Sequence, residues 1–174
     1  MFEVKIYIET SLQGPAKKEG AYVAIIEYIK KSGEPETRQI EGYIESTTFH
    51  ESTLRAMIRA LGRLEKECHV ILYTNCPYVK RTVEGDRLDA WQAAGWKRAD
   101  GKEIKNKRLW SIFQAYRNLH DIKVHFSKHH EYKRLLQDEL KKIQEASEKC
   151  RKTLKTLSKD GISEHVSDDS AKVG

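Results

Sequence analysis

The sequence predicts an α/β fold (α+β in some conventions) built on one mixed β-sheet, and three observations lead to it. Residues 4–11 alternate apolar and polar side chains and are rich in β-branched types, which is typical of a β-strand. Two further strands follow over short turns, as in an antiparallel meander. The period then becomes helical, and a continuous apolar run follows the helix. This order of elements predicts a fourth strand that lies parallel to the first across a helical crossover.

The meander is expected to consist of residues 4–11, 21–30 and 37–46. Gly and Pro residues mark both turns, at 14–20 and at 34–35. Glu9 stands where the first strand gives way to a polar run. Ligands gather at the carboxyl ends of strands, so Glu9 is a candidate for metal chemistry, and the alternative is a solvated carboxylate at a strand end.

Residues 48–66 form the first predicted helix, because apolar residues recur there at helical spacing. These residues are Leu54, Met57, Ile58, Leu61 and Leu64. The opposite face carries Arg55, Arg59 and Arg63, which fit a solvated helix face as well as a binding surface. Ser46, Thr47 or Thr48 is expected to cap the helix, with Glu51 completing a capping box after Thr48.

The second half of the chain is expected to add strands at 69–74 and 122–126 and helices at 78–83, 109–119 and 131–157. Residues 88–110 form a segment that carries all three tryptophans interleaved with lysines and arginines. The domain is expected to span residues 1–157. The aperiodic residues 158–174 are expected to form a disordered tail.

Composition predicts a soluble domain with a polyanionic partner. The chain has 174 residues, 33% charged and 39% hydrophobic, with a formal net charge of +6 and a pI of about 9.1. Such a charge fits nucleic acid. Three cysteines without C-x-x-C spacing argue against a disulfide framework. No segment resembles a signal peptide or a membrane span, and a cytoplasmic location is expected.

Four local matches make this sequence similar to type 1 ribonuclease H. I-Y-I-E-T-S at 6–11 resembles the first strand of that family, and T-T-x-x-x-x-T-L-x-A-x-I-x-A-L-x-x-L at 47–64 resembles its first helix. H-V-I-L-Y-T-N-C-P-Y-V at 69–79 resembles the strand and turn that follow. W-x-x-x-x-W-K-x-A-D-G-K-x-I-K-N-x-x-L-W at 91–110 resembles the basic protrusion that grips nucleic acid. The resemblance covers residues 4–140 and implies a ribonuclease H-like, five-stranded mixed sheet flanked by helices.

The resemblance also implies cleavage of the RNA strand of an RNA/DNA hybrid with two Mg²⁺ ions, which four carboxylates hold in that family. At the matching positions this sequence carries Glu9, Thr53, Asn75 and Asp138, so half of the anionic ligands are absent. Glu9 is also one methylene longer than the usual Asp. A shift of about an ångström can lower a rate on the order of 10²-fold. Two-metal catalysis is therefore expected to be lost or severely impaired.

Other acids and two histidines are candidates for rebuilding the site. Mg²⁺ or Mn²⁺ would be held weakly, if at all, by Glu9 and Asp138. Glu139 adjoins Asp138, whereas Glu51 lies two residues from Thr53, about 200° around a helix. His129 or His130 stands where the family carries a mobile histidine as a proton shuttle.

The protrusion at 88–110 is expected to bind nucleic acid. The residues expected to make the contacts are Trp91, Trp96, Lys97, Arg98, Lys102, Lys105, Lys107 and Arg108. The structural alternative is that the tryptophans are ordinary core residues, and at least one is expected to pack against the sheet. Cys76 is interpreted as a small buried residue, because no zinc-ligand spacing surrounds it.

Three functions follow as hypotheses. The first is a ribonuclease H-like domain that binds an RNA/DNA hybrid or duplex with cleavage degraded. The second is an active, metal-dependent ribonuclease H that uses Glu9, Glu51, Asp138 and Glu139. The third is a protein-interaction scaffold: the apolar stripe of residues 131–157 past Leu140 would dock a partner or a second copy, unless it packs back on the domain.

Overall fold

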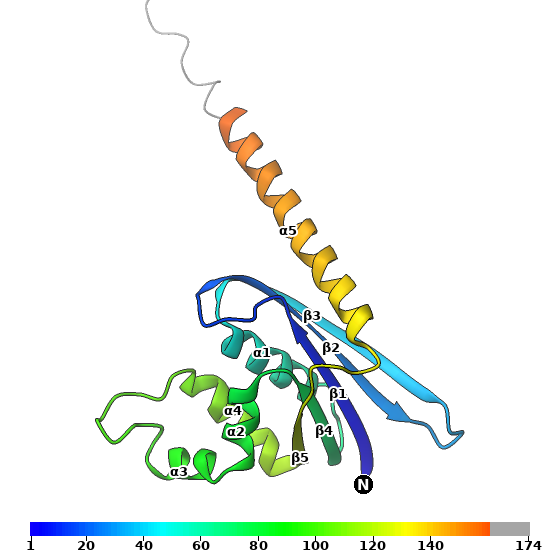
Figure 1. Ribbon diagram of the computed structural model, residues 1–174, viewed down its shortest axis with the longest axis vertical. Helices are drawn as coiled ribbons and strands as arrows, with labels where there is room; N and C mark the ends of the chain where they lie inside the picture. The colour runs from blue at the N-terminus through cyan, green and yellow to red at the C-terminus, as the bar shows by residue number, and fades with distance from the viewer. Residues whose placement is uncertain (161–174) are drawn as a thin grey trace, which may run out of the picture.

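A computed structural model describes residues 1–160 of the chain, and it contains one five-stranded mixed sheet with helices on both faces (Figure 1). The strands are β1 (Phe2–Thr10), β2 (Lys18–Ile29), β3 (Pro35–Thr47), β4 (Cys68–Thr74) and β5 (Asp121–Phe126). The helices are α1 (Phe49–Leu61), α2 (Pro77–Glu84), α3 (Arg87–Ala93), α4 (Lys107–Leu119) and α5 (Lys133–Asp160). The predicted fold class is confirmed.

The strands lie in the order β3-β2-β1-β4-β5, so the first strand of the chain is central. β1 pairs antiparallel with β2, and β2 pairs antiparallel with β3, which confirms the predicted meander. β4 lies parallel to β1 across the α1 crossover, and β5 lies parallel to β4. The carboxyl ends of β1, β4 and β5 therefore meet at one edge of the sheet.

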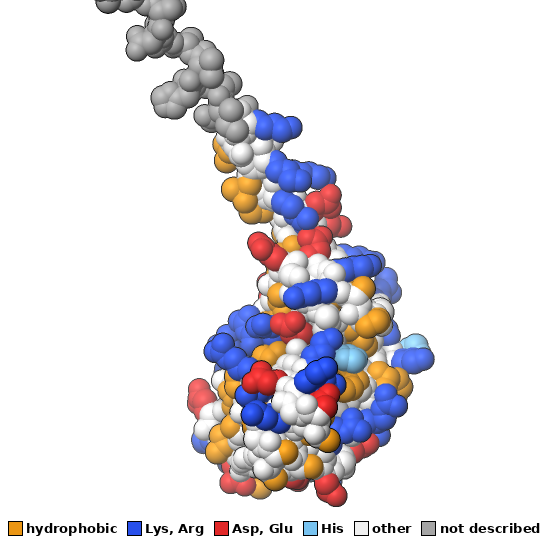
Figure 2. All heavy atoms as spheres, turned by 90° about the vertical axis from the view of Figure 1, so that its left-hand side faces the viewer, with side chains coloured by type: hydrophobic (Ala, Val, Ile, Leu, Met, Phe, Trp, Pro, Cys, Tyr) orange, Lys and Arg blue, Asp and Glu red, His pale blue; other side chains and the backbone are white. Residues whose placement is uncertain are grey.

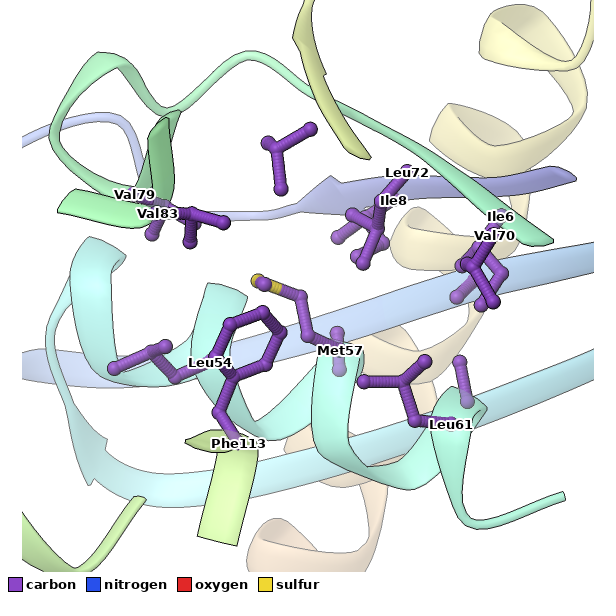
Figure 3. Packing of buried hydrophobic residues seen from close by; sticks show 14 of the residues in the cluster. Ile6, Ile8, Leu54, Met57, Leu61, Val70, Leu72, Val79, Val83 and Phe113 are labelled. Carbon is purple, nitrogen blue, oxygen red and sulfur yellow. The ribbon is translucent and has the colours of Figure 1, made fainter. Parts of the chain in front are cut away.

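The main core fills the space between one face of the sheet and helices α1, α2 and α4, as Figure 3 shows. Alternation along β1 and β4 sends Ile6, Ile8, Val70 and Leu72 to this face. The helices contribute Leu54, Met57, Leu61, Val79, Val83 and Phe113. Because a fully buried apolar side chain of this size contributes about 1.5–3 kcal/mol, this layer supplies most of the driving force for folding.

A smaller core lies on the opposite face, between the sheet and α5. Tyr7 of β1 packs there with Leu136 and Leu140 of α5 and with Ala21, Val23 and Ile25 of β2. α5 then continues well past the sheet (Figure 1). It extends to Asp160, so Ser158–Asp160 are helical, and the rest of the predicted disordered tail lies outside the described residues. No helix within residues 1–160 is long and apolar enough to cross a membrane.

The first helix is shorter than predicted. It begins after Thr48, whose side chain accepts a hydrogen bond from the Glu51 amide at 3.3 Å, so Thr48 is the N-cap among the three candidates. It ends at Leu61 rather than at residue 66. The amides of Arg63 and Leu64 bond three residues back instead of four, which tightens the chain toward β4. Leu64 still packs against the core, which explains its helical spacing in the sequence.

Gly42 allows the Tyr22 ring to cross β3, and its replacement should destabilise the fold. The two residues face each other in the β2–β3 ladder, and a Cβ at Gly42 would overlap the ring of Tyr22. Tyr22 is buried, and its hydroxyl accepts a hydrogen bond from Arg59 at 3.2 Å. Gly42→Ala should lower the free energy of unfolding in urea by about 1–3 kcal/mol, because the ring must leave its position.

The matched control is Gly14→Ala, since a Cβ at Gly14 meets no atom within 4 Å. Both substitutions reduce the entropy of the unfolded chain in the same way. The control should therefore stay within about 0.5 kcal/mol of the wild type. Equal stabilities of the two variants would contradict the close approach of Tyr22 to Gly42.

Candidate functional site

The carboxyl edge of the sheet gathers the polar groups that the sequence singled out. Glu9 is the residue before the last of β1, and Asn75 directly follows the parallel strand β4. The loop between β5 and α5 brings His130 to the same edge. Ligand sites in sheets of this kind form where parallel strands end, so this edge is the candidate site.

Glu9 is held by a histidine. Its Oε1 lies 3.0 Å from Nε2 of His130, and the two side chains are 2% and 4% exposed. The interpretation of Glu9 as a solvated carboxylate is therefore wrong. Of the two candidate histidines, His130 reaches Glu9, whereas His129 is exposed. A buried carboxylate requires such a partner, since burying an unpaired charge is costly.

Two tyrosine hydroxyls form hydrogen bonds between the sheet and the loop before α5. The Tyr7 hydroxyl donates to Glu131 at 2.8 Å, and the Tyr132 hydroxyl donates to the buried Glu27. Burial, followed by the bond to Glu131, raises the pKa of Tyr7 above its ordinary value. The bond to Glu27, followed by burial, raises the pKa of Tyr132 to about 12. Both hydroxyls therefore stay protonated as donors at neutral pH and keep the loop closed over Glu9.

Thr53 lies in α1 and is part of the buried layer under that helix. Its side chain is fully buried, and its hydroxyl donates to the Phe49 carbonyl at 2.8 Å inside α1. Cys76 is also fully buried, as the sequence predicted, and burial raises the pKa of its thiol. Asn75, between Thr74 and Cys76, is half-buried and neutral. Thr53 and Asn75 thus offer no anionic oxygen to the site.

Each of the remaining candidate acids has a cation beside it. The side chain of Asp138 is 56% exposed, with Nζ of Lys141 at 4.0 Å. Glu139 accepts from Lys142 at 2.7 Å, and this bond lowers its pKa. Glu51 accepts two bonds from Arg55, at 2.9 and 3.0 Å. Each of these carboxylates already has a counter-charge, unlike a carboxylate cluster that awaits a metal.

This arrangement does not fit two Mg²⁺ ions, which need several anionic oxygens that converge on one point. Glu9 contacts an imidazole, and Thr53 offers only a neutral hydroxyl oxygen. Among the residues that the structure describes, no three His, Cys, Asp or Glu side chains come together as metal ligands. The predicted ligands Glu9 and Asp138 thus belong to no such cluster.

The protrusion projects from the side of the domain as a loop in Figure 1. Lys97 and Glu103 form a bridge across it, and the Arg98 amide donates to the Lys102 carbonyl at 2.8 Å. Gly101 has φ +80, which a glycine adopts without strain. These backbone contacts define the conformation of the turn at residues 97–103 of the protrusion.

The tryptophans anchor the protrusion to the core. Trp110 is fully buried and meets Trp91 edge to face at 6.0 Å, as well as Tyr78 and Phe113. Trp91 and Trp96 are half-buried against the same core cluster. The structural alternative is thus right for Trp110. Trp91 and Trp96 retain an exposed part beside the basic residues.

The cations of the protrusion fall into two groups. Arg98 pairs with Asp100 at 3.3 Å and Lys107 with Glu103 at 2.7 Å. Lys97, Lys102 and Lys105 form no ion pair within residues 1–160. Figure 2, which looks onto this side, shows Lys and Arg side chains spread across the surface with acidic ones between them. The unpaired lysines are the groups best placed to meet a polyanion.

A second cationic feature lies between α1 and α4 and was only partly visible in the sequence. A groove of about 460 Å³ is lined by Arg55, Arg59 and Arg108, with Glu51 as the acid among them. Asn106 also lines it, with φ +59 and a buried amide nitrogen that finds no partner in the described chain. Sequence reasoning missed Asn106. Asn106 lies in the motif matched at 91–110 but was not singled out there, although Asn tolerates positive φ.

Comparisons with known proteins agree on one family. A family model described as RNase H matches residues 2–146. The chain is similar to ribonuclease H of Lachnoclostridium phytofermentans, with 33% identity over 129 residues that cover 74% of this chain and 82% of the relative. It is also similar to ribonuclease H of Oleidesulfovibrio alaskensis, with 32% identity over 130 residues that cover 75% and 80%.

Solved structures show the same fold. LC9-RNase H1, described as a type 1 RNase H with the type 2 active-site motif, has a TM-score of 0.61 and 24% identity. The match covers 75% of this chain and 64% of that one. A foamy viral protease–reverse transcriptase in complex with RNA/DNA hybrid has a TM-score of 0.60 and 17% identity, over 78% of this chain and 19% of the viral one.

Proposed function

Since the chain belongs to the ribonuclease H family, we propose that it is a domain of the type 1 class that binds an RNA/DNA hybrid or duplex and has lost, or nearly lost, two-metal cleavage. One observation carries the proposal: Glu9, at the position of the first metal ligand, is buried against His130. A cation that bound this carboxylate would have to compete with His130 for its Oε1.

The charge at the other positions supports the same conclusion. Thr53 and Asn75 replace two carboxylates with neutral groups, and Asp138 is exposed beside Lys141. Two Mg²⁺ ions carry four positive charges, which two separated acids cannot balance. One weakly held Mg²⁺ or Mn²⁺ is the most that we propose for this edge.

The grip on nucleic acid rests on the protrusion and on the arginine groove beside it. Lys105 adjoins the groove in sequence, because its neighbour Asn106 lines the groove. Phosphate contacts by such cations supply most of the affinity of proteins for duplexes. Related folds from foamy virus are described in complex with RNA/DNA hybrid and with dsDNA, which makes both candidate ligands.

The main alternative is an active ribonuclease H that assembles its site from Glu9, Glu51, Asp138 and Glu139. The ion pairs of Glu51 with Arg55 and of Glu139 with Lys142 count against it, because metal binding would have to break both. A scaffold that has dropped nucleic acid is the third candidate, and the experiment below separates it from the other two.

Charge reversal in the protrusion should weaken hybrid binding. In the triple variant Lys97→Glu, Lys102→Glu and Lys105→Glu, three cations without acidic partners become anions. We expect the Kd for a fluorescently labelled RNA/DNA hybrid to rise at least about tenfold at low salt. The slope of log K against log salt should become shallower by about 0.9 for each phosphate that the variant no longer neutralises. Fluorescence anisotropy across a salt series measures both quantities.

The matched control reverses three exposed lysines elsewhere, Lys31, Lys123 and Lys155. Its net charge equals that of the test variant. Its affinity for the hybrid should therefore fall only by the part that depends on the net charge of the protein. An equal loss in both variants would remove the special role of the protrusion. No binding of hybrid or duplex by the wild type would leave the scaffold as the better hypothesis.

A further inference from the structure

The part of α5 that extends past the sheet carries an exposed apolar stripe (Figure 1). Leu136 and Leu140 bury the first turns of the helix in the smaller core, and Ile143 packs partly buried beside them. Farther along the same helix, Leu154 and Leu157 are 61% and 63% exposed. Figure 2 shows hydrophobic side chains along one side of this part of α5 and Lys and Arg side chains along the other. Such a stripe is a surface for another apolar face.

The spacing of the stripe indicates which kind of element fits it. Between Leu136 and Leu157 the members of the stripe are separated alternately by four and three residues, and they are Leu140, Ile143, Ser147, Cys150 and Leu154. This repeat of 3.5 residues persists over three heptads. It is the a and d pattern of a coiled coil, whereas a helix that only covers a sheet has a wider stripe with a 3.6-residue period. A second helix is therefore the expected partner of the stripe.

The flanks of the stripe place little charge against such a helix. With the stripe at positions a and d, the neighbouring e and g positions from residue 144 to residue 158 are Gln144, Ala146, Arg151, Thr153 and Ser158. Arg151 is the one charged residue among them, and it pairs with Glu19 of its own domain at 2.6 Å. The lysines of this part of α5 occupy the outer positions b, c and f. An identical helix would thus meet no row of like charges.

A groove beside the stripe is acidic on its other side. Its volume is about 670 Å³, and it lies between the stripe and the residues Glu19 of β2 and Glu45 of β3. Glu45 is exposed and forms no ion pair within residues 1–160. The far end of α5 has the complementary character, because Leu157 lies there between Lys155 and Lys159. The groove therefore fits the far end of an α5 helix from a second copy of this chain.

We propose that two copies of this chain dimerise through antiparallel contact of their α5 helices, with the far end of each helix in the groove of the other. Leu154 then faces Cys150 of the second copy, and Leu157 faces Ser147, so that each layer pairs a large side chain with a small one. Lys159 reaches the acidic side of the groove. The contact is isologous, because each copy supplies the same surface.

The domain itself sets the direction of the two helices. The sheet already covers the stripe at Leu136 and Leu140, so a parallel partner helix would meet the domain. Two antiparallel helices instead place the two domains at opposite ends of the pair. The protrusion projects from another side of the domain than α5 (Figure 1), so the dimer would present two protrusions to one nucleic acid. Dimerisation itself does not depend on nucleic-acid binding.

Sedimentation equilibrium of the full chain tests the proposal. We expect the wild type to pass from monomer to dimer as its concentration rises. Leu157→Glu should raise the dimer Kd at least about tenfold, because the interface would bury an unpaired charge beside acidic residues. The matched control is Leu119→Glu at the end of α4, where the leucine is 61% exposed, and it should dimerise like the wild type. Both variants should melt like the wild type at concentrations where it is monomeric.

A wild type that stays monomeric at every concentration would overturn the proposal and leave the stripe to a different protein. An equal rise of the dimer Kd in Leu157→Glu and Leu119→Glu would also overturn it, since the stripe would then have no special role.

Cross-linking tests the antiparallel direction. In Leu154→Cys the new thiol faces Cys150 of the second copy, and oxidation with copper phenanthroline should join the two chains into a dimer on a non-reducing gel. Lys155→Cys, at the next position on the outer side of the helix, is the matched control and should stay mostly monomeric. Cys68 and Cys76 are buried in both variants. Equal cross-linking of the control would overturn the contact, and so would equal cross-linking of the wild type through Cys150 alone, which indicates a parallel pair.

Discussion

The wild-type protein is expected to leave the RNA strand of a labelled RNA/DNA hybrid intact in Mg²⁺ and in Mn²⁺. The reason is the state of Glu9, which is buried with its Oε1 3.0 Å from His130. Thr53 and Asn75 supply no charge to replace it. Misplacement of a reacting group by about an ångström already costs on the order of 10²-fold in rate. The loss of two carboxylates should add to this.

The informative comparison restores the carboxylates. In the variant Glu9→Asp, Thr53→Glu and Asn75→Asp, all four positions are acidic again, because Asp138 is already present. The shorter Asp at position 9 also withdraws from His130. We expect this variant to cleave the RNA strand of the hybrid in Mg²⁺. Gel analysis of the labelled RNA strand measures cleavage.

The outcomes separate the hypotheses. If the wild type does not cleave the RNA strand and the variant does, the result supports the metal-ligand positions assigned by resemblance. It also supports the loss of catalysis in the wild type. Cleavage by the wild type that Glu9→Gln abolishes would refute the loss and favour the alternative with Glu51 and Glu139. Silence from both proteins would mean that the scaffold itself no longer places a substrate at this edge.

Local signals in the sequence were sufficient to predict the fold. Apolar residues alternate in β1 and β4 and recur with a 3.6-residue period in α1, because one face of each element is buried. Such a pattern can be seen within a single segment of the sequence. A cap at Ser46, Thr47 or Thr48 could be predicted because capping involves residues only three apart, and the structure selects Thr48. The end of α1 could not be predicted, because Leu64 keeps the helical spacing of apolar residues although the helix has already ended at Leu61.

The candidate site could be predicted only in its chemistry. The resemblance placed Glu9, but the residue that holds it lies 121 positions away, and His129 was an equal choice in the sequence. The same limit applies to Tyr7 with Glu131 and to Arg59 with Tyr22, which are contacts between distant segments. Tertiary packing determines which distant residues pair, and the hydrophobic pattern within one segment does not reveal these contacts. The burial of Trp110 likewise depends on α2 and α3 closing over α4.

The second large effect is expected at His130. Removing its ring leaves the Glu9 carboxylate buried without a partner, and breaking a buried pair in this way commonly costs about 3–5 kcal/mol. His130→Ala should therefore lower the free energy of unfolding by about 3 kcal/mol in urea titrations. His129→Ala, at the exposed neighbour, is the matched control and should change it by less than about 0.5 kcal/mol.

A double-mutant cycle assigns this loss to the pair. Glu9→Gln removes the charge while keeping the size of the side chain, so the double variant Glu9→Gln/His130→Ala should be less destabilised than the two single changes added together. A His130→Ala protein as stable as His129→Ala would mean that Glu9 does not rely on His130, and the carboxylate would then be available to a metal. Calorimetric titration of Mg²⁺ into the same variant checks that alternative directly. The stability that the Glu9–His130 pair provides and the expected absence of RNA cleavage would thus both result from the same contact.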